Sequence, residues 1–342
     1  MVGWVAVIPV IAPGYSGNRF VASAGGGVGE TGLMVSGSRG LGEGAESRAL
    51  QRATPSLEAL AWVVAVAGAR SVEAVEPMPG GGSLAMHRVR VTFADGASAP
   101  LVLRRFVRLG QIAEDPGVAG HEAAVLQLVE RIATPTPRLI GVDASGDLVG
   151  TPALLMTELA GRPAWTTNLR WMHQLVEVLV DVHAIDAATA SMVRPFAVYA
   201  QQSYALPKWV TTPAVWERAI EILHGPVSDE DCTFIHRDFY PGNVLWHRRA
   251  VSGLVDWEAA SVGPRSMDVA HCRINLLFSG LHTAELFTSE WEDITGCVFD
   301  RWADIATIIG LLDSYRRHPP ARAQQHAIET MLQYAVDACD AP

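Results

Sequence analysis

The chain has 342 residues, of which 49% are hydrophobic. A chain of this length exceeds one average domain and can bury a large core, so we expect two lobes or two domains. The formal net charge of -10 and the isoelectric point near 5.5 argue against a nucleic-acid partner, which usually requires a basic patch. An acidic surface suits a cationic small substrate, although many cytosolic proteins are equally acidic.

The beginning of the chain differs from the rest in composition. Twelve of the 31 glycines lie in residues 1–50, where hydrophobic periodicity is weak, so we expect a flexible glycine-rich extension or a misplaced translation start. The apolar start has no preceding Lys or Arg and is interrupted by Pro9 and Pro13, which makes it a poor signal peptide and too short a membrane span. We therefore expect no membrane contact and a cytoplasmic location.

The four cysteines show no C-x-x-C spacing. Cysteines far apart in a long chain are typical of reduced, mostly buried thiols in a cytoplasm. His271 beside Cys272 could form a pair of metal ligands, but no second pair accompanies it, so we expect core packing there. The cysteines are Cys232, Cys272, Cys297 and Cys339.

Ordered structure is expected to begin near Thr54 and Pro55, where a capping residue and a proline precede a helix over 56–67 that Gly68 closes. Three strand-like runs follow, separated by GGGS and ADGAS turns, and they predict an antiparallel meander. These runs cover residues 71–79, 85–93 and 99–107.

The next segments lead from a strand-rich to a helical region. Residues 120–133 have apolar side chains at helical spacing and precede two prolines, so we predict a helix there, and 151–159 has the pattern of a strand that ends in a loop. From about residue 165 the pattern is mainly helical. We therefore expect an α+β fold, with a small strand-rich lobe before a larger helical lobe. The predicted lobes are 51–160 and 161–342, and the predicted C-terminal helices are 169–186, 213–225 and the stretches from Asp268 onward.

The sequence FIHRDFYPGNVLW, residues 234–246, places an acid five residues ahead of an amide, with a Pro-Gly turn between them. Phosphoryl transfer from a nucleotide to a hydroxyl requires a carboxylate that orients and deprotonates the acceptor, and oxygen ligands for Mg2+ on the phosphates. Asp238 is the candidate base. Asn243, brought round by the turn, is a candidate metal ligand through its side-chain carbonyl.

A second metal ligand is expected at a nearby strand end. In SGLVDWEAA, residues 252–260, an apolar strand runs into Asp256, and residues 244–253 would form the intervening hairpin. Because Mg2+ prefers carboxylate and carbonyl oxygens, Asp256 and Asn243 converging from two strand ends would make a suitable site.

The segments HRDFYPGNVLW and GLVDWEAASVGPRSMDVAH resemble the protein-kinase-like superfamily, and within it the aminoglycoside phosphotransferase (APH) family of small-molecule kinases. The resemblance covers roughly residues 70–340. It implies a two-lobed, protein-kinase-like fold, with a small antiparallel-sheet N-lobe containing one main helix and a larger, mostly helical C-lobe. It also implies ATP or GTP as phosphate donor, Mg2+ as metal and a small hydroxylated molecule as acceptor. By this resemblance Asp238 is the catalytic base, Asn243 and Asp256 are Mg2+ ligands, and His236 and Asp268 support the catalytic loop.

The same resemblance assigns nucleotide-binding residues to the N-lobe. Arg104, at an inward position of its strand, stands where the superfamily has a lysine, and Glu122 on the following helix is its candidate partner. Arg keeps the positive charge and offers a planar fork, but it is longer than Lys. A glycine-rich loop would cover the phosphates, and the connector between the lobes would bind the adenine. The loop residues are Gly81, Gly82 and Ser83, and the connector residues are Met156, Glu158 and Leu159.

The acceptor pocket is expected in the helical lobe. Acidic side chains could attract an amine-bearing antibiotic, and tryptophan faces could hold a sugar, a base or a cation. The same residues could equally be core tryptophans and a solvated run of charge. They are Trp209, Trp216, Trp291, Glu290, Glu292 and Asp293.

Several functions stay open at this point. An antibiotic kinase, acting on an aminoglycoside, macrolide or nucleoside-type compound, competes with a metabolic kinase acting on choline, homoserine or a sugar. A catalytically inactive nucleotide-binding protein is a third alternative because the strand lysine is absent, although the base and both metal ligands are retained. A protein kinase is disfavoured because about ten residues separate Asp256 from Asp268, too few for a long activation segment. The acceptor, the choice between ATP and GTP, and the oligomeric state do not follow from the sequence.

Overall fold

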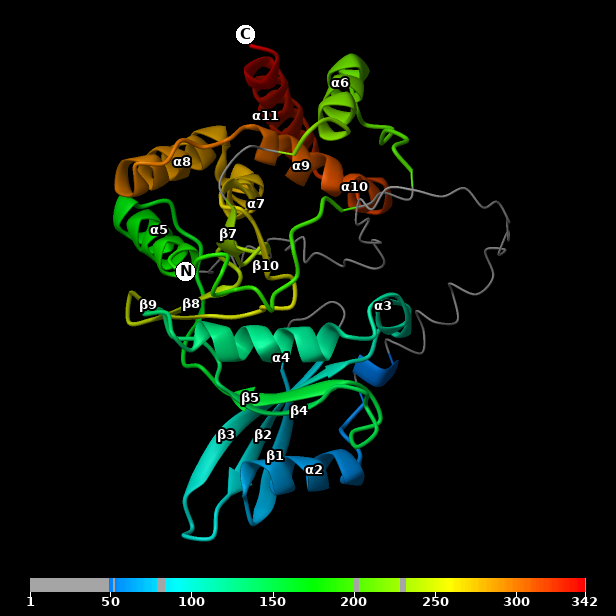
Figure 1. The fold of residues 1–342 in the computed structure, drawn as a ribbon, viewed down its shortest axis with the longest axis vertical. Helices are drawn as coiled ribbons and strands as arrows, with labels where there is room; N and C mark the ends of the chain where they lie inside the picture. Colours follow the sequence, from blue (N-terminus) through cyan, green and yellow to red (C-terminus); the bar gives the residue numbers. More distant parts are fainter. Residues whose placement is uncertain (1–48, 52, 79–83, 200–202, 228–231, 342) are drawn as a thin grey trace, which may run out of the picture.

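The computed structural model describes residues 49–51, 53–78, 84–199, 203–227 and 232–341. Over these residues the chain combines an antiparallel sheet in a small N-lobe with a larger, mainly helical C-lobe (Figure 1). The predicted α+β class and the two-lobed arrangement are confirmed. The expectation of a glycine-rich extension concerns a segment whose first 48 residues lie outside the described part of the chain.

The N-lobe sheet has five antiparallel strands in the order β1-β2-β3-β5-β4. A tight turn joins β2 to β3, where Asp95 accepts a hydrogen bond from the Ala97 N–H at 2.9 Å and Gly96 has a φ of 82°. The first three strands form the predicted meander, and β5 then pairs with β3. The strands are β1 (Ser71–Pro77), β2 (Leu84–Thr92), β3 (Ser98–Phe106), β4 (Leu139–Asp143) and β5 (Ala153–Thr157).

Helix α2 (Leu57–Ala67) covers one face of this sheet (Figure 1). The Ser56 side chain accepts a hydrogen bond from the Ala59 N–H, and Gly68 ends the helix with a left-handed φ of 62°. The N-cap is therefore Ser56, two residues after the predicted Thr54, because the first unpaired helical N–H groups lie within reach of its hydroxyl. The buried face of the helix consists of Ala59, Trp62 and Val63.

Helix α4 (Val118–Val129) lies on the other side of the sheet, between the sheet and the C-lobe (Figure 1). Its apolar side chains belong to one cluster with Val102 and Leu154 of the sheet and with the core of the C-lobe. The helix predicted at 120–133 is confirmed, with both ends closer to the N-terminus. Short helix α3 (Leu109–Glu114) precedes it and was not predicted. Because α4 packs against both lobes, its side chains can contact residues of either.

The C-lobe is predominantly helical, as predicted, and includes two small sheets. In one, β7 (Cys232–Ile235) pairs with β10 (Ser261–Pro264), and in the other β8 (Val244–His247) lies between β6 (Arg162–Pro163) and β9 (Ala250–Leu254). Strands β8 and β9 form the predicted hairpin. The helices are α5 (Leu169–His183), α6 (Pro213–Leu223), α7 (Ser266–Leu276), α8 (Leu281–Thr295), α9 (Trp302–Gly310), α10 (Leu312–Arg317) and α11 (Arg322–Asp340).

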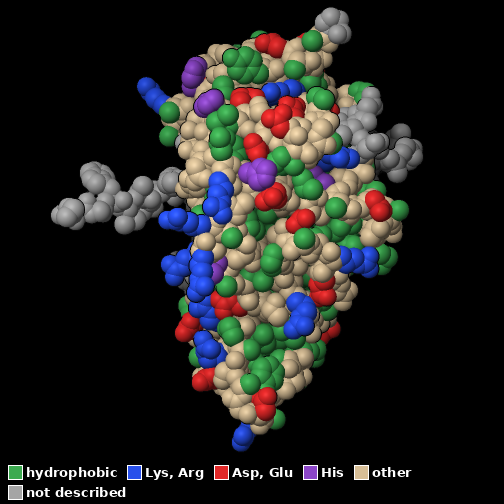
Figure 2. All heavy atoms as spheres, turned by 90° about the vertical axis from the view of Figure 1, so that its left-hand side faces the viewer, with side chains coloured by type: hydrophobic (Ala, Val, Ile, Leu, Met, Phe, Trp, Pro, Cys, Tyr) green, Lys and Arg blue, Asp and Glu red, His purple; other side chains and the backbone are tan. Residues whose placement is uncertain are grey.

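The molecule is elongated, and its N-lobe forms the narrow end. Figure 2 shows acidic, basic and hydrophobic side chains interspersed over one face. Among the helices that the structure describes, none combines the length and the apolar character needed to cross a membrane.

Candidate active site

The loop between β7 and β8, residues 236–243, is held by a carboxylate of helix α7. Asp268 is fully buried and accepts hydrogen bonds from the backbone N–H groups of His236 at 2.9 Å and of Arg237 at 2.5 Å. His183 Nε2 lies 3.0 Å from the same carboxylate. Arg237 has a left-handed φ of 68°, so these two bonds fix the backbone where the loop turns most sharply.

His236 is a framework residue within the core. Its Nε2 lies 3.0 Å from the carbonyl oxygen of Val255, and its ring packs on Trp257 with a centroid distance of 4.5 Å. Its Nδ1 accepts a hydrogen bond from the Asp238 N–H at 3.3 Å. A neutral imidazole with its proton on Nε2 satisfies both contacts, and the ring thereby links the loop to the segment after β9.

The Asp238 carboxylate is held on both oxygens. Asn243 Nδ2 donates to Asp238 Oδ2 at 2.9 Å and to the Asp238 backbone carbonyl at 2.8 Å. His271 Nε2, from α7, lies 2.9 Å from Asp238 Oδ1. Core packing was expected at His271, and this is wrong in part: its neighbour Cys272 is fully buried, but His271 contacts Asp238. A signal in the sequence was its spacing of three residues from Asp268, which places both on one helical face.

The Pro-Gly turn brings Asn243 back to Asp238, as predicted. The Asn243 N–H donates to the Tyr240 carbonyl at 2.9 Å, which closes the turn. A Cβ at Gly242 would lie 2.3 Å from the Tyr240 ring, so the turn requires glycine for steric reasons. Both Asn243 amide hydrogens point at Asp238, and within the described part of the chain no donor reaches its side-chain carbonyl oxygen.

Asp256 follows β9 and joins the loop through the backbone. The Val255 N–H donates to the Asn243 carbonyl at 3.0 Å, so the two strand ends that carry Asn243 and Asp256 are in contact. Asp256 has a left-handed φ of 73°, an uncommon backbone conformation for a residue other than glycine. Its Oδ1 accepts a hydrogen bond from Arg104 at 2.7 Å.

Arg104 brings together acids from both lobes. Its Nε lies 3.0 Å from Glu122 of α4, and its terminal nitrogen lies 2.7 Å from Asp256 and 3.1 Å from Glu258. Glu258 also accepts a hydrogen bond from Gln111 of α3. Arg104 is 3% exposed, so this guanidinium is a buried cation between β3, α4 and the segment after β9. We call Arg104, Glu122, Asp256 and Glu258 the interlobe cluster.

The interlobe cluster contains more acid than base. Burial raises the pKa of Glu122, and the carboxylates of Glu258 and Asp256 raise it further, which outweighs the charge of Arg104. Burial also raises the pKa of Glu258. For Asp256, burial acts in the same direction, but the charge and hydrogen bond of Arg104 dominate and lower its pKa. With all three acids ionised, one cation faces three anions.

Arg104 occupies the position expected for a strand lysine. Lys208, in the C-lobe, is the single lysine of the whole chain, so β3 has no lysine to offer. The neighbouring Arg105 contacts a different part of the molecule and donates to the carbonyl of Ala53 at 2.7 Å. The alternation of the strand thus sends Arg104 toward the acids and Arg105 away from them.

The connector between the lobes follows β5. Met156 is buried in the strand, and the Glu158 carboxylate accepts hydrogen bonds from Arg88 Nε of β2 at 2.9 and 2.8 Å. Leu159 packs so closely on the C-lobe that a Cβ at Gly253 would lie 2.4 Å from its side chain. The expected phosphate-covering residues Gly81, Gly82 and Ser83 lie outside the described residues.

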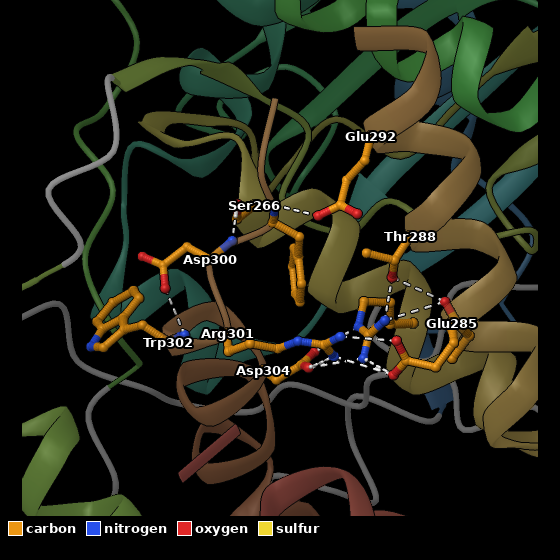
Figure 3. A network of polar contacts seen from close by, with 11 residues as sticks. Ser266, Glu285, Thr288, Glu292, Asp300, Arg301, Trp302 and Asp304 are labelled. Atoms are coloured by element: carbon orange, nitrogen blue, oxygen red, sulfur yellow. Dashed lines mark hydrogen bonds and ion pairs between the residues drawn. The ribbon is translucent and has the colours of Figure 1, made fainter. Parts of the chain in front are cut away.

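Two of the candidate acceptor-binding residues take the alternative role of core tryptophans. Trp216 and Trp291 are fully buried in the hydrophobic core, which contradicts a lining role because neither ring has a free face. Glu290 lies 2.6 Å from His173. Glu292, which is labelled in Figure 3, accepts a hydrogen bond from the Phe299 N–H at 2.9 Å. A pocket does adjoin Asp238, and it has no acidic side chain among its lining residues. They are Phe196, Val198, Tyr199, Arg237, Met267, His271, Ala306 and Thr307.

The far side of α7 is anchored by a second charged cluster (Figure 3). Arg273 is fully buried and donates to the two carboxylate oxygens of Asp304 at 3.0 Å each. It also contacts Glu285 and Thr288 of α8, and Arg301 donates to Glu285 at 2.9 Å. We call Arg273, Glu285, Arg301 and Asp304 the C-lobe cluster. It fixes α7 to α8 and α9, and α7 in turn carries Asp268 and His271.

The candidate metal ligands offer hard oxygen atoms. Among the described residues, no group of three or more His, Cys, Asp and Glu side chains is arranged to hold a metal ion. Asn243 and Asp256 alone would therefore need oxygen ligands from a substrate, as in Mg2+ sites completed by phosphates. Their donor types and the acidic excess of the interlobe cluster fit such an ion.

Comparison with known proteins identifies the family. The phosphotransferase enzyme family matches residues 81–287, which is more than half of the chain. No curated protein matches the chain significantly. Solved structures that share the fold include macrolide 2'-phosphotransferase MphH from Brachybacterium faecium, with 18% identity, a TM-score of 0.50 and coverage of 80% of this chain and 97% of that one.

Two further solved structures carry nucleotides. Aminoglycoside 2'-phosphotransferase-IIIa with GDP has 15% identity and a TM-score of 0.55, and covers 81% of this chain and 97% of its own. A thermostable mutant of aminoglycoside phosphotransferase APH(4)-Ia with ADP and hygromycin B has 12% identity and a TM-score of 0.54, with coverages of 83% and 99%. At such identities these structures show a common fold. Together with the match over residues 81–287, they lead to one conclusion: the chain belongs to the phosphotransferase enzyme family.

Proposed function

We propose that this protein transfers the γ-phosphoryl group of ATP or GTP to a hydroxyl group of a small molecule, with Mg2+. One observation carries this proposal: Asp238 and Asn243 share a hydrogen bond of 2.9 Å, and the strand end that carries Asp256 is bonded to Asn243. The backbone segments that carry a candidate base and two candidate metal ligands are thus in contact, beside an ion pair that links the lobes.

Asp238 would orient the acceptor hydroxyl and take its proton. Its carboxylate is partly exposed and held by Asn243 and His271, which supports a fixed position near the bound acceptor. His236 and Asp268 would maintain the loop, since they bond its backbone. The positive charge that phosphoryl transfer requires at the phosphates would be supplied by Mg2+ held by Asn243 and Asp256.

Arg104 would act mainly on Asp256. The guanidinium is already surrounded by Glu122, Asp256 and Glu258, so it would hold a metal ligand in place and close the ion pair between the lobes. An Arg in the lysine position is thus compatible with activity.

The nucleotide would lie between the lobes. We propose that 51–160 is the nucleotide-binding lobe, that 161–342 carries catalysis and acceptor binding, and that 1–50 is an extension. The Glu158 carboxylate is bonded to Arg88, so the connector would bind the adenine edge through its backbone. The proposed nucleotide contacts are Gly81, Gly82, Ser83, Met156, Glu158 and Leu159.

The acceptor would be an antibiotic of the aminoglycoside, macrolide or nucleoside type, or else a metabolite. The pocket beside Asp238 has aromatic and aliphatic walls and one arginine, and Arg237 lies over the Tyr199 ring at 3.9 Å. All four cysteines are free thiols, which supports a reducing, cytoplasmic location.

The proposal is tested by incubating the protein with Mg-ATP or Mg-GTP and a panel of hydroxylated antibiotics and metabolites. We expect mass spectrometry to detect one phosphorylated acceptor, and Asp238→Asn to lower its rate of formation by about 10²–10⁴-fold, as for loss of a general base. A variant with native turnover would refute the role of Asp238. Nucleotide binding without any turnover would instead support an inactive binding protein.

A further inference from the structure

Asp238 is held by a side chain outside the catalytic loop. His271 Nε2 lies 2.9 Å from Asp238 Oδ1, and the two side chains are 13% and 16% exposed. Asn243 donates to the other oxygen, Oδ2, at 2.9 Å. Among the described residues, each side-chain oxygen of the candidate base therefore has one contact, from Asn243 on Oδ2 and from His271 on Oδ1.

Contacts on both oxygens restrict the rotation of an aspartate carboxylate. The last torsion of an aspartate joins an sp3 to an sp2 carbon and has a broad distribution, so a carboxylate with a single partner can rotate. Contacts on both oxygens fix its plane. An ionised carboxylate offers about four acceptor positions, so two donors leave room for the hydroxyl of a substrate.

Helix α7 contacts both the backbone of the loop and the side chain of Asp238. Asp268 bonds the backbone N–H groups of the loop, and His271, one turn later on the same face, contacts the Asp238 side chain. Arg273 on the other face binds Asp304 of α9 (Figure 3). The imidazole is thus carried by a helix that is itself anchored in the core, which is what precise placement of a carboxylate requires.

We propose that His271 is a positioning residue of the phosphoryl transfer, whose Nε2 contacts Asp238 Oδ1 and so keeps the carboxylate in the orientation that accepts the proton. His271 acts through Asp238, since the proton of the acceptor goes to the aspartate. This inference rests on the proposed function, in which Asp238 is the base.

The test compares two amides of different reach. In His271→Gln the amide nitrogen lies near the position of imidazole Nε2 and can still donate to Asp238, whereas in His271→Asn the shorter side chain stops near the position of Nδ1. Both variants are neutral and polar. We expect His271→Asn to lower kcat by about 10²-fold, the cost of a misplaced catalytic group, with an unchanged KM for the nucleotide. His271→Gln should retain most of the native turnover.

Turnover is measured as phosphoryl transfer from Mg-ATP or Mg-GTP, with thermal unfolding of each variant as the control for folding. Native kcat in His271→Asn would overturn the inference. So would an equal loss in both variants together with a lower Tm, because that result would indicate a role in packing alone. The proposed function fails separately, if Asp238→Asn keeps native turnover.

The contact between His271 and Asp238 can also be observed without an acceptor. In 15N-labelled protein the Nε2–H signal of His271, assigned by its loss in His271→Gln, should move on Asp238→Ala. An unchanged signal in a folded Asp238→Ala variant would overturn the inference, whether or not an acceptor is known.

Discussion

Two buried arginines in the described part of the chain are surrounded by acids, and their clusters differ in charge balance. In the interlobe cluster Arg104 faces Glu122, Asp256 and Glu258. In the C-lobe cluster Arg273 and Arg301 face Glu285 and Asp304. The C-lobe cluster therefore has two cations for two anions, whereas the interlobe cluster has one cation for three. The contacts of the C-lobe cluster are therefore balanced in charge, whereas those of the interlobe cluster contain more acid than base.

The difference in charge balance suggests different roles for the two clusters, although both are built from arginines and acids. A buried charge is costly unless it is paired, so a neutral cluster holds helices together, and an unbalanced one is kept only where a ligand or proton restores the balance. The pKa values of Glu122 and Glu258 are raised first by burial, and the neighbouring carboxylates raise them further. Substitutions in the two clusters should therefore affect different quantities.

The largest effect is expected from Asp256→Asn in the interlobe cluster. Loss of the carboxylate weakens metal binding at the phosphates and removes the anion that Arg104 orients, so kcat should fall by about 10³-fold, or about 4 kcal/mol of transition-state stabilisation. The free energy of unfolding should change little because the excess of acid is reduced. Steady-state phosphoryl transfer and urea unfolding measure the two quantities, and a stability loss without a kinetic one would contradict the comparison.

Arg273→Met in the C-lobe cluster is expected to lower stability and to leave turnover nearly unchanged. Asp304 would keep only the weaker contact with Arg301, whose nitrogen lies 3.4 Å away, so the free energy of unfolding should fall by about 3 kcal/mol, as for a broken buried pair. Turnover per folded molecule, measured well below the Tm, should stay close to native. A stability unchanged in urea unfolding would show that the cluster does not anchor α7.

Binding of Mg-nucleotide should raise the Tm of variants in the two clusters to different extents. Mg-nucleotide at 100 times its Kd should raise the free energy of unfolding by about 2.7 kcal/mol, because it binds only the folded state. Asp256→Asn should lose most of the corresponding rise in Tm, and Glu285→Gln should keep it. The measurement is thermal unfolding with and without Mg-ATP or Mg-GTP. An equal rise in both variants would place the metal away from Asp256.

The smallest effect concerns acid stability. Burial raises the pKa of Glu285, but hydrogen bonds from Arg301 and Arg273 dominate and lower it to about 2. A pKa below that of the unfolded chain stabilises the fold above pH 4.5, and the contribution is lost as the pH falls from about 4.5 to about 2. Because this carboxylate is partly exposed, the contribution should be below about 1 kcal/mol. Glu285→Gln should therefore flatten the decline of stability in this range, as measured by urea unfolding at pH 6 and pH 3.

Much of the candidate site could be predicted because its parts are close in sequence. Asp238 and Asn243 are five residues apart across a Pro-Gly turn, and their contact needs only that turn. Strand alternation was enough to separate Arg104 from Arg105. The contact of His271 with Asp238 could not be derived in this way, since 33 positions separate them and no turn or repeat links them. The burial of Trp216 and Trp291 likewise depends on helices that are far apart in sequence.

The sequence by itself determined the two lobes, the loop that carries Asp238 and Asn243, and the strand end that carries Asp256, because turn residues and hydrophobic periodicity act over short stretches of chain. Only the tertiary structure decided that Arg104 contacts three acids from α4 and the segment after β9, and that His271 of α7 contacts Asp238. The physical reason is that charge pairing and hydrogen bonding depend on distances in space, and packing of the whole core sets those distances.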